Sequence, residues 1–243
     1  APSYNAFIKL SENKKVDWNE NSIKGSPPDM ASLLSAATKI SGKKIHVITI
    51  DMPISLVPFK TRRVADNKIS KEFGSRWCSA HSPNSDRPGE LGRSISTSLI
   101  EFGFKLAVEN SGDKESPYLL EVYPHVGLLS LLQRKKRVPY KISKSKKYWP
   151  DADIEQRKEN LLFQFQAICA GLTSVFGKLN LVLPETNDFK TLSFLKRYED
   201  TLDALICAWV GVQFIANETI PLGDSTAAIW CPRDVVVFDK KSL

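Results

Sequence analysis

The sequence has little of what zinc sites, disulfide frameworks and membrane spans require. Its 243 residues include 4 cysteines and 3 histidines, with no Cys-x-x-Cys pair and no metal-ligand spacing, so a zinc site of the usual kind is not expected. Widely spaced cysteines favour buried free thiols, which indicates a cytoplasmic protein, or a nuclear one in a eukaryote. The longest apolar stretch, 202–216, contains Asp203 and Gln213 and is shorter than the roughly 20 residues that span a bilayer, so no membrane partner is expected.

Motifs for two common enzyme classes are also missing. The chain has no glycine-rich phosphate loop of the Walker or dinucleotide type, which counts against nucleotide hydrolysis. Cys78, Ser79 and His81 share a polar stretch, but no nucleophile elbow accompanies them. A serine or cysteine hydrolase is therefore not expected.

What is present is the composition of an ordinary folded protein. Hydrophobic residues make up 42% and charged residues 25% of the chain, which suits a globular fold with a substantial core. We find no internal repeat and no flexible linker. One domain over residues 1–243 is the resulting prediction.

Hydrophobic periodicity predicts strands and helices in alternation. A near-continuous β-branched run at 45–50 predicts a central strand covered on both faces. The whole pattern predicts an α/β fold with layers of helices on a sheet. The first predicted elements are strands at 4–10 and 16–18, which a turn-rich stretch at 11–14 joins into an opening hairpin. The others are a helix at 29–40, the strand at 45–50, an ordered excursion with one short helix at 58–88, a helix at 94–109, a strand at 118–123, and helices at 126–132, 151–176 and from 188 or 195 to 217.

Two acidic residues belong to predicted strands. Asp51 ends the β-branched strand, and the carboxyl ends of central strands are where ligands bind in α/β sheets. Glu121 lies inside a strand among large aliphatic residues. Because acidic residues are depleted in strands, Glu121 needs a basic side chain or a cation as partner, unless it faces water on an edge strand.

Two further carboxylates lie on the last long helix. Asp200 and Asp203 are three residues apart, and their helix face continues through small residues to Gly211, which would let the helix approach the sheet closely. For Asp200 the alternative is a favourable interaction with the helix dipole. If Asp51, Glu121, Asp200 and Asp203 converge, they form an oxygen-only site that suits Mg²⁺ or Mn²⁺ and two-metal phosphoryl transfer.

These residues lie in segments that resemble family 429 of the domains of unknown function, whose members are predicted nucleases with a ribonuclease H-like fold. The resemblance covers residues from about 44 to the end and is most specific near the C-terminus. It lies in TIDMPISLV around Asp51, RRVADNKISKEFG at 62–74, LEVYPHV around Glu121, and EDTLDALICAWVGVQFI followed by GDSTAAIWCP.

The resemblance implies a ribonuclease H-like mixed sheet with helices on both faces and an acidic metal site. Asp51, Glu121, Asp200 and Asp203 match the acidic positions, and the first, second and last of these are the implied metal ligands. Arg63 and Asp66 match a polar pair, with Arg63 expected to bind substrate and Asp66 to orient a catalytic group. The family also has an Asp on the first strand, which 4–10 lacks. That residue either precedes Ala1, with the domain truncated at this strand, or is missing from the protein.

One segment carries almost all of the net charge. Residues 134–147 contain eight basic and no acidic residues, whereas the whole chain carries +7, so the other 229 residues sum to −1. Such a segment attracts backbone phosphates, and neighbouring aromatic residues could stack on bases; the alternatives are a solvated loop or a nuclear localisation signal. The residues expected to bind nucleic acid are Arg134, Lys135, Lys136, Lys141 and Lys144, with Tyr140, Tyr148 and Trp149 as the aromatic neighbours.

These features together predict a divalent-metal-dependent nuclease that acts on DNA or RNA, with no obligate protein partner evident. His125 follows Glu121 closely and could orient a water or a substrate oxygen, although a lone His after a strand is more often structural. One alternative is a nucleic-acid-binding module of the same fold without catalytic activity. The other is a nucleotide-hydrolysing protein of a related fold.

Overall fold

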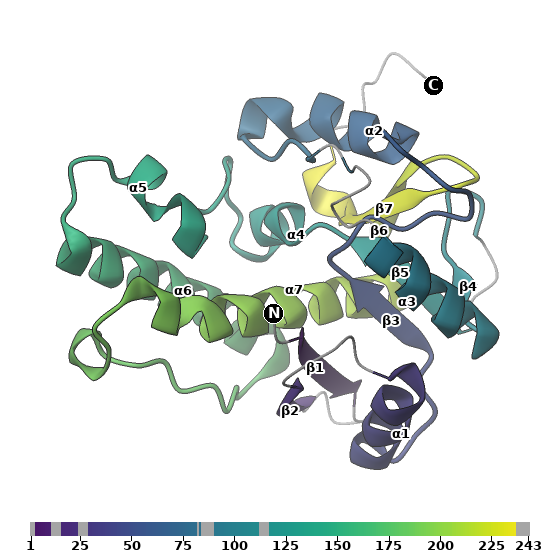
Figure 1. The fold of residues 1–243 in the computed structure, drawn as a ribbon, viewed down its shortest axis with the longest axis horizontal. Coiled ribbons are helices and arrows are strands. Elements are labelled where there is room, and N and C mark those ends of the chain that lie inside the picture. The colour runs from purple at the N-terminus through teal and green to yellow at the C-terminus, as the bar shows by residue number, and fades with distance from the viewer. Residues whose placement is uncertain are drawn as a thin grey trace.

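The computed structural model describes residues 3–10, 16–23, 29–81, 83, 90–111 and 117–236. Its main sheet is mixed and mostly parallel, and β5 lies at its centre (Figure 1). Among the described residues, three strands pair with β5 (Tyr118–Val122) and run parallel to it. Strand β3 (Val47–Ile50) lies on one side of β5, and β4 (Lys105–Leu106) and β7 (Ala228–Pro232) lie on the other side. The last strand, β6 (Thr219–Gly223), is antiparallel to β7.

An antiparallel hairpin precedes this sheet, as predicted. Strand β1 (Ser3–Leu10) pairs with β2 (Val16–Ile23) over the whole length of both strands. The predicted turn between them lies outside the described residues. Strand β1 contacts the long helix α7 (Lys196–Ile215), near the labelled N-terminus in Figure 1.

The prediction that 45–50 forms the central strand is wrong in one respect. Within the described part of the chain, β3 pairs with β5 alone, and β5 has neighbours on both sides. Both faces of β3 are nevertheless covered, since Val47 packs on one core and Ile48 on another. A β-branched run indicates that both faces of the strand are buried, but it does not indicate whether the strand has neighbours on both edges.

Alternate residues of β5 enter two different cores because successive side chains of a strand point to opposite faces. Leu120 packs with the long helices α6 (Ile154–Phe176) and α7, which lie side by side. Leu119 packs on the other face with Met30 and Leu99. The helices of that second face are α1 (Met30–Ser41) and α3 (Glu90–Glu101), together with α2 (Val64–Phe73), which packs over β6 and β7.

Helices on both faces of a mixed sheet confirm the predicted fold class, which is consistent with a ribonuclease H-like α/β fold. Helix α4 (Pro124–Leu131) follows β5 directly and packs against α6 and α7. The single turn α5 (Ser145–Tyr148) precedes α6. No helix among the described residues is long and apolar enough to cross a membrane. The four cysteines are free, as predicted.

Most predicted helices are confirmed, with ends set by local hydrogen bonds. Helix α1 begins after Asp29, whose carboxylate accepts hydrogen bonds from the N–H groups of Ala31 and Ser32. Helix α6 begins after Asp153, which forms a reciprocal capping pair with Gln156. Both arrangements satisfy N–H groups that lack a partner within the first turn of a helix.

Two predictions about the order of elements are wrong. The helix predicted at 94–109 ends at Glu101, because Gly103 takes a positive φ of 89° and the chain continues into β4. A pair of long helices was also predicted as the last elements of the fold, whereas strands β6 and β7 follow α7 and complete the sheet. The close apolar spacing at 228–232 resembles the end of a helix as much as it resembles a strand, because a short apolar run does not distinguish the two.

Candidate functional site

Helix α7 lies unusually close to β3, and this contact positions the candidate site. A Cβ atom at Gly211 would lie 3.0 Å from Cγ2 of Thr49 and 3.4 Å from Cγ1 of Val47. The small-residue face predicted for this helix is therefore the face that meets the sheet. Because Asp203 lies about two turns before Gly211, it reaches the carboxyl end of β3, where Asp51 follows.

Three carboxylates gather on the first two turns of α7. One oxygen atom from each of Glu199, Asp200 and Asp203 lies within 4.8 Å of the other two, close enough to hold a metal ion. Glu199 and Asp203 are buried, whereas Asp200 is half-buried. The sequence interpretation missed Glu199 as a site residue. Its signal was the spacing of four residues to Asp203, which places both on one helix face.

Lysine and tyrosine side chains hold these carboxylates in place. Lys141 forms an ion pair with Asp203, and its Nζ atom lies 3.6 Å from Glu199. The hydroxyl of Tyr140 donates a hydrogen bond to the other oxygen of Asp203. Lys196 pairs with Glu199 at 2.8 Å and also with Asp200. With Asp51, the site therefore has four carboxylates and two ammonium groups, a formal charge of −2.

Asp51 adds a carboxylate that solvent can reach. Loss of hydration beside the packed protein and the negative charge of Asp203 raise the pKa of Asp51 to about 7, although Lys141 opposes the shift. Because an exposed carboxylate keeps much of its hydration, we regard the charge of Asp203 as the more important cause. Burial also raises the pKa of Asp203, against the opposing effects of Lys141 and Tyr140. Both shifts mean that the site favours an added positive charge.

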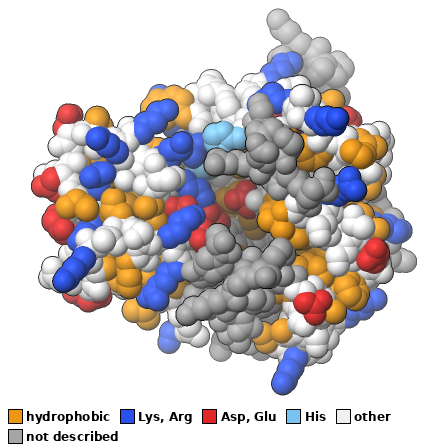
Figure 2. All heavy atoms as spheres, in the orientation of Figure 1, with side chains coloured by type: hydrophobic (Ala, Val, Ile, Leu, Met, Phe, Trp, Pro, Cys, Tyr) orange, Lys and Arg blue, Asp and Glu red, His pale blue; other side chains and the backbone are white. Residues whose placement is uncertain are grey.

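Figure 2 shows acidic side chains gathered in a hollow near the middle of the molecule, with lysine and arginine side chains beside them. A ligand that approaches this face therefore meets both signs of charge. This distribution suits a complex of a cation with an anion better than it suits either ion alone.

Glu121 lies on the other face of the sheet from α7. Its carboxylate is bound by both terminal nitrogens of Arg63, at 2.6 and 2.7 Å, and by the N–H of Ile54 at 2.9 Å. Arg63 also binds Asp66 at 2.7 Å. The structure thus supplies the basic partner that a buried Glu121 needs, and it holds Glu121, Arg63 and Asp66 together outside the acidic cluster of α7. Their predicted roles toward metal and substrate stay predictions.

His125 is deeply buried and lies beside the site. Its ring packs edge-on against Tyr123 and Tyr140, with centroids 5.3 Å away in each case. Burial, and then the positive charges of Arg137 and Lys141, hold its pKa well below the usual value, so the ring is neutral. Its Nδ1 atom has no hydrogen-bond partner among the described residues. Its contacts are packing contacts, and its predicted orienting role stays a prediction.

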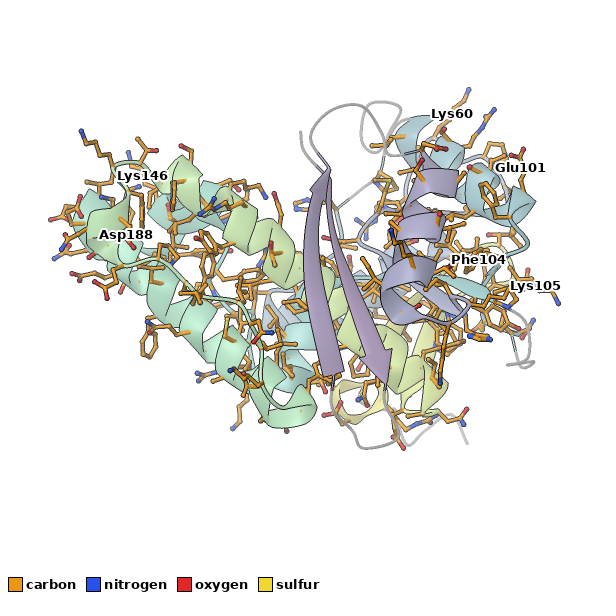
Figure 3. All side chains as sticks on the ribbon, turned by 90° about the horizontal axis from the view of Figure 1, so that it is seen from below. Lys60, Glu101, Phe104, Lys105, Lys146 and Asp188 are labelled. Carbon is orange, nitrogen blue, oxygen red and sulfur yellow. The ribbon has the colours of Figure 1, made fainter. Side chains whose placement is uncertain are left out.

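The basic segment 134–147 divides into an exposed part and a buried part. The side chains of Arg134, Lys135, Lys136 and Lys144 are exposed, as is that of Lys146, which points into solvent near the end of the molecule that carries Asp188 (Figure 3). In contrast, Tyr140 is fully buried and Lys141 is largely buried in the acidic cluster. Tyr140 therefore offers no ring face to a base, whereas Tyr148 and Trp149 are half-buried.

Comparison with known proteins identifies a family and no individual relative. A family model described as "Protein of unknown function (DUF429)" matches residues 7–227. Neither a curated protein nor a solved structure matches the chain. The matched range includes Asp51, all three carboxylates of α7 and the basic segment. The chain therefore belongs to the DUF429 family of proteins of unknown function.

Proposed function

We propose that this protein is a divalent-metal-dependent phosphodiesterase that acts on nucleic acid. The observation that carries the proposal is the cluster of Glu199, Asp200 and Asp203 on α7, whose carboxylate oxygens lie close enough to hold a metal ion. Asp51, at the carboxyl end of β3, lies near enough for the charge of Asp203 to raise its pKa. The basic segment that enters this site through Lys141 supports it, because a polyanionic substrate needs positive charge beside the metal ligands.

The residues present suit a hard divalent cation. The available donors are carboxylate oxygens, which Mg²⁺ and Mn²⁺ prefer. Two lysines leave a formal charge of −2 in a site formed by Asp51, Glu199, Asp200 and Asp203, and one divalent ion would balance it. Of these donors, Asp51 is the most accessible to an entering ion.

Each residue then has a distinct task. Asp51 and Asp203 would hold the ion, while Glu199 and Asp200 would complete the site or orient its ligands. Lys141, which is ion-paired with Asp203, would keep that carboxylate ionised and favour a phosphate nearby. A divalent ion, when bound, supplies an activated water and neutralises charge that develops on the phosphate.

An activity assay with Asp51→Asn tests the proposal. Wild-type protein is expected to cleave single-stranded, duplex or branched substrates only with Mg²⁺ or Mn²⁺, and the variant is expected to lose at least about a hundredfold of that activity, since even groups that only support a metal ligand contribute 10–100-fold. Glu109→Gln is the control, because Glu109 forms an exposed ion pair with Lys68. Full activity in Asp51→Asn would exclude this site.

One observation favours a second function, a nucleic-acid-binding module without catalytic activity. The ammonium group of Lys141 is ion-paired with Asp203 and lies near Glu199. It therefore neutralises part of the negative charge that a metal ion would otherwise neutralise. In such a module the carboxylates of α7 would serve to hold the basic segment in place, and metal would be unnecessary.

Metal affinity in Lys141→Met distinguishes the two functions. If the site is a metal site, the variant is expected to bind Mn²⁺ about tenfold more tightly, because removal of a nearby positive charge lowers the repulsion felt by the ion. Calorimetric titration or Mn²⁺ electron paramagnetic resonance measures this. If neither the wild type nor the variant binds Mn²⁺ at millimolar concentration, the binding module is the correct function.

A further inference from the structure

Trp77 is a large aromatic side chain that the fold leaves in solvent. It is 62% exposed, although an indole ring is usually buried for most of its surface. Its backbone has a positive φ of 64°, which is uncommon for a residue other than glycine. The N–H of Trp77 donates to the carbonyl of Gly74 at 3.0 Å, and the N–H of Cys78 donates to that of Phe73 at 3.0 Å. A hydrogen-bonded turn therefore fixes the backbone that carries the ring.

The basic segment is fastened to the same turn. The guanidinium of Arg76 donates hydrogen bonds to the carbonyls of Arg134 at 2.9 Å and Lys135 at 3.1 Å. The N–H of Arg137 donates to the carbonyl of Arg76 at 2.9 Å. In Figure 1 the segment between α4 and α5 accordingly passes close to the carboxyl end of α2. Because Arg76 binds the backbone of this segment, the side chains at 134–136 are free to face solvent.

The indole and the lysines form one surface. The Nζ atom of Lys136 lies 4.3 Å from the centroid of the Trp77 ring, within the range of a cation–π contact. Arg134 and Lys135 are exposed beside it. The surface thus combines an aromatic face with three positive charges. The segment 134–147 that carries these charges contains no acidic residue.

The same segment connects this surface to the acidic cluster. Lys136 and Lys141 are five residues apart, so their Cα atoms are at most about 18 Å apart along an extended chain. Lys141 is ion-paired with Asp203. A single-stranded nucleic acid that is bound at Trp77 could therefore reach the carboxylates of α7 within a few nucleotides.

We propose that Trp77, Arg134, Lys135 and Lys136 bind a single-stranded nucleic acid, with one unpaired base stacked on the indole and the neighbouring phosphates on the basic side chains. Stacking needs a base whose face is free, which a single strand offers and a duplex does not. The positive charges favour a polyanion over a protein segment of mixed charge. This inference deepens the proposed function and depends on it only for the class of substrate.

Two probes of equal length separate stacking from charge. One is a fluorescein-labelled oligothymidylate, and the other is the same sugar-phosphate chain without bases; anisotropy is measured with EDTA present so that no cleavage occurs. Trp77→Ala is expected to weaken binding of oligothymidylate about tenfold or more and to leave binding of the abasic chain unchanged. Trp77→Phe should retain most of the affinity. Phe163→Ala is the matched control, since Phe163 on α6 is 64% exposed.

The outcomes are separable from those of the nuclease assay. Equal affinity of Trp77→Ala and wild type for oligothymidylate, or equal weakening toward both probes, would overturn the stacking site. So would a wild-type protein that prefers duplex over single strand. Wild-type protein should bind oligothymidylate in EDTA, because binding at Trp77 needs no metal. A wild-type protein that binds oligothymidylate in EDTA but cleaves no substrate when Mg²⁺ or Mn²⁺ is added would contradict the proposed hydrolysis and leave this site standing.

Discussion

Arg63→Met is expected to destabilise the protein by about 3–5 kcal/mol, the largest effect on stability that we predict. The guanidinium of Arg63 binds both oxygens of Glu121 and also Asp66, and the side chains of Arg63 and Glu121 are each only 5% exposed. Removal of the guanidinium leaves the carboxylate of Glu121 buried without a counter-charge. The free-energy cost of this uncompensated buried charge, more than the lost attraction between the two groups, sets the size of the destabilisation. Urea unfolding of both proteins, monitored by circular dichroism, measures the difference.

A double substitution shows whether the buried charge is the cause. Arg63→Met with Glu121→Leu is expected to recover most of the lost stability, since two apolar side chains can replace a buried pair at little cost. Lys68→Met is the control for removal of a positive charge, because Lys68 forms an exposed pair with Glu109, and it should change stability by less than about 1 kcal/mol. A loss below about 1 kcal/mol in Arg63→Met would contradict this account.

Asp203→Asn is expected to reduce metal-dependent hydrolysis by at least about a hundredfold and to weaken Mn²⁺ binding in parallel. Asp203 binds both Lys141 and Tyr140, and its charge acts on Asp51. Asparagine keeps the size of the side chain and an oxygen that can accept from Tyr140, but it removes the negative charge. Cleavage rates and calorimetric Mn²⁺ titrations provide the measurement.

Asp200→Asn is the matched control on the same helix. Its side chain is half-buried and paired with Lys196, so the substitution should reduce activity by less than about tenfold. The thermal unfolding midpoint of each variant verifies that it folds, since Asp203→Asn leaves Lys141 with a weaker partner. If Asp200→Asn impairs hydrolysis as much as Asp203→Asn does, the metal lies nearer the start of α7 than we infer.

Local patterns were sufficient for most elements of the fold. Periodic apolar residues located α1, α4, α6 and α7 within a few residues of their observed ends. The β6–β7 hairpin was missed, because short apolar runs fit a strand or a helix and only pairing with β5 makes β7 a strand. The resemblance to a family contributed the site residues Arg63 and Asp66, which no local pattern indicates.

For the candidate site, chemistry was predictable and geometry was not. Asp51 and Asp203 were identified as carboxylates placed to converge, and they lie near enough for the charge of Asp203 to raise the pKa of Asp51. Glu121 was grouped with them, but the register that pairs it with Ile229 also turns its side chain toward Arg63. A strand has a period of two, so one residue decides which face a side chain occupies.

The sequence by itself determined which groups are available: a surplus of positive charge confined to 134–147, carboxylates at the end of a strand and on a helix, and no thiolate or imidazole site. Only the tertiary structure decided how they combine. In the folded protein Lys141 is buried among the carboxylates of α7, Glu121 forms an ion pair with Arg63, and Trp77 lies against Lys136. The reason is that charge and periodicity are properties of neighbouring residues, whereas these pairs are 58 to 62 residues apart and meet only when helices and strands pack.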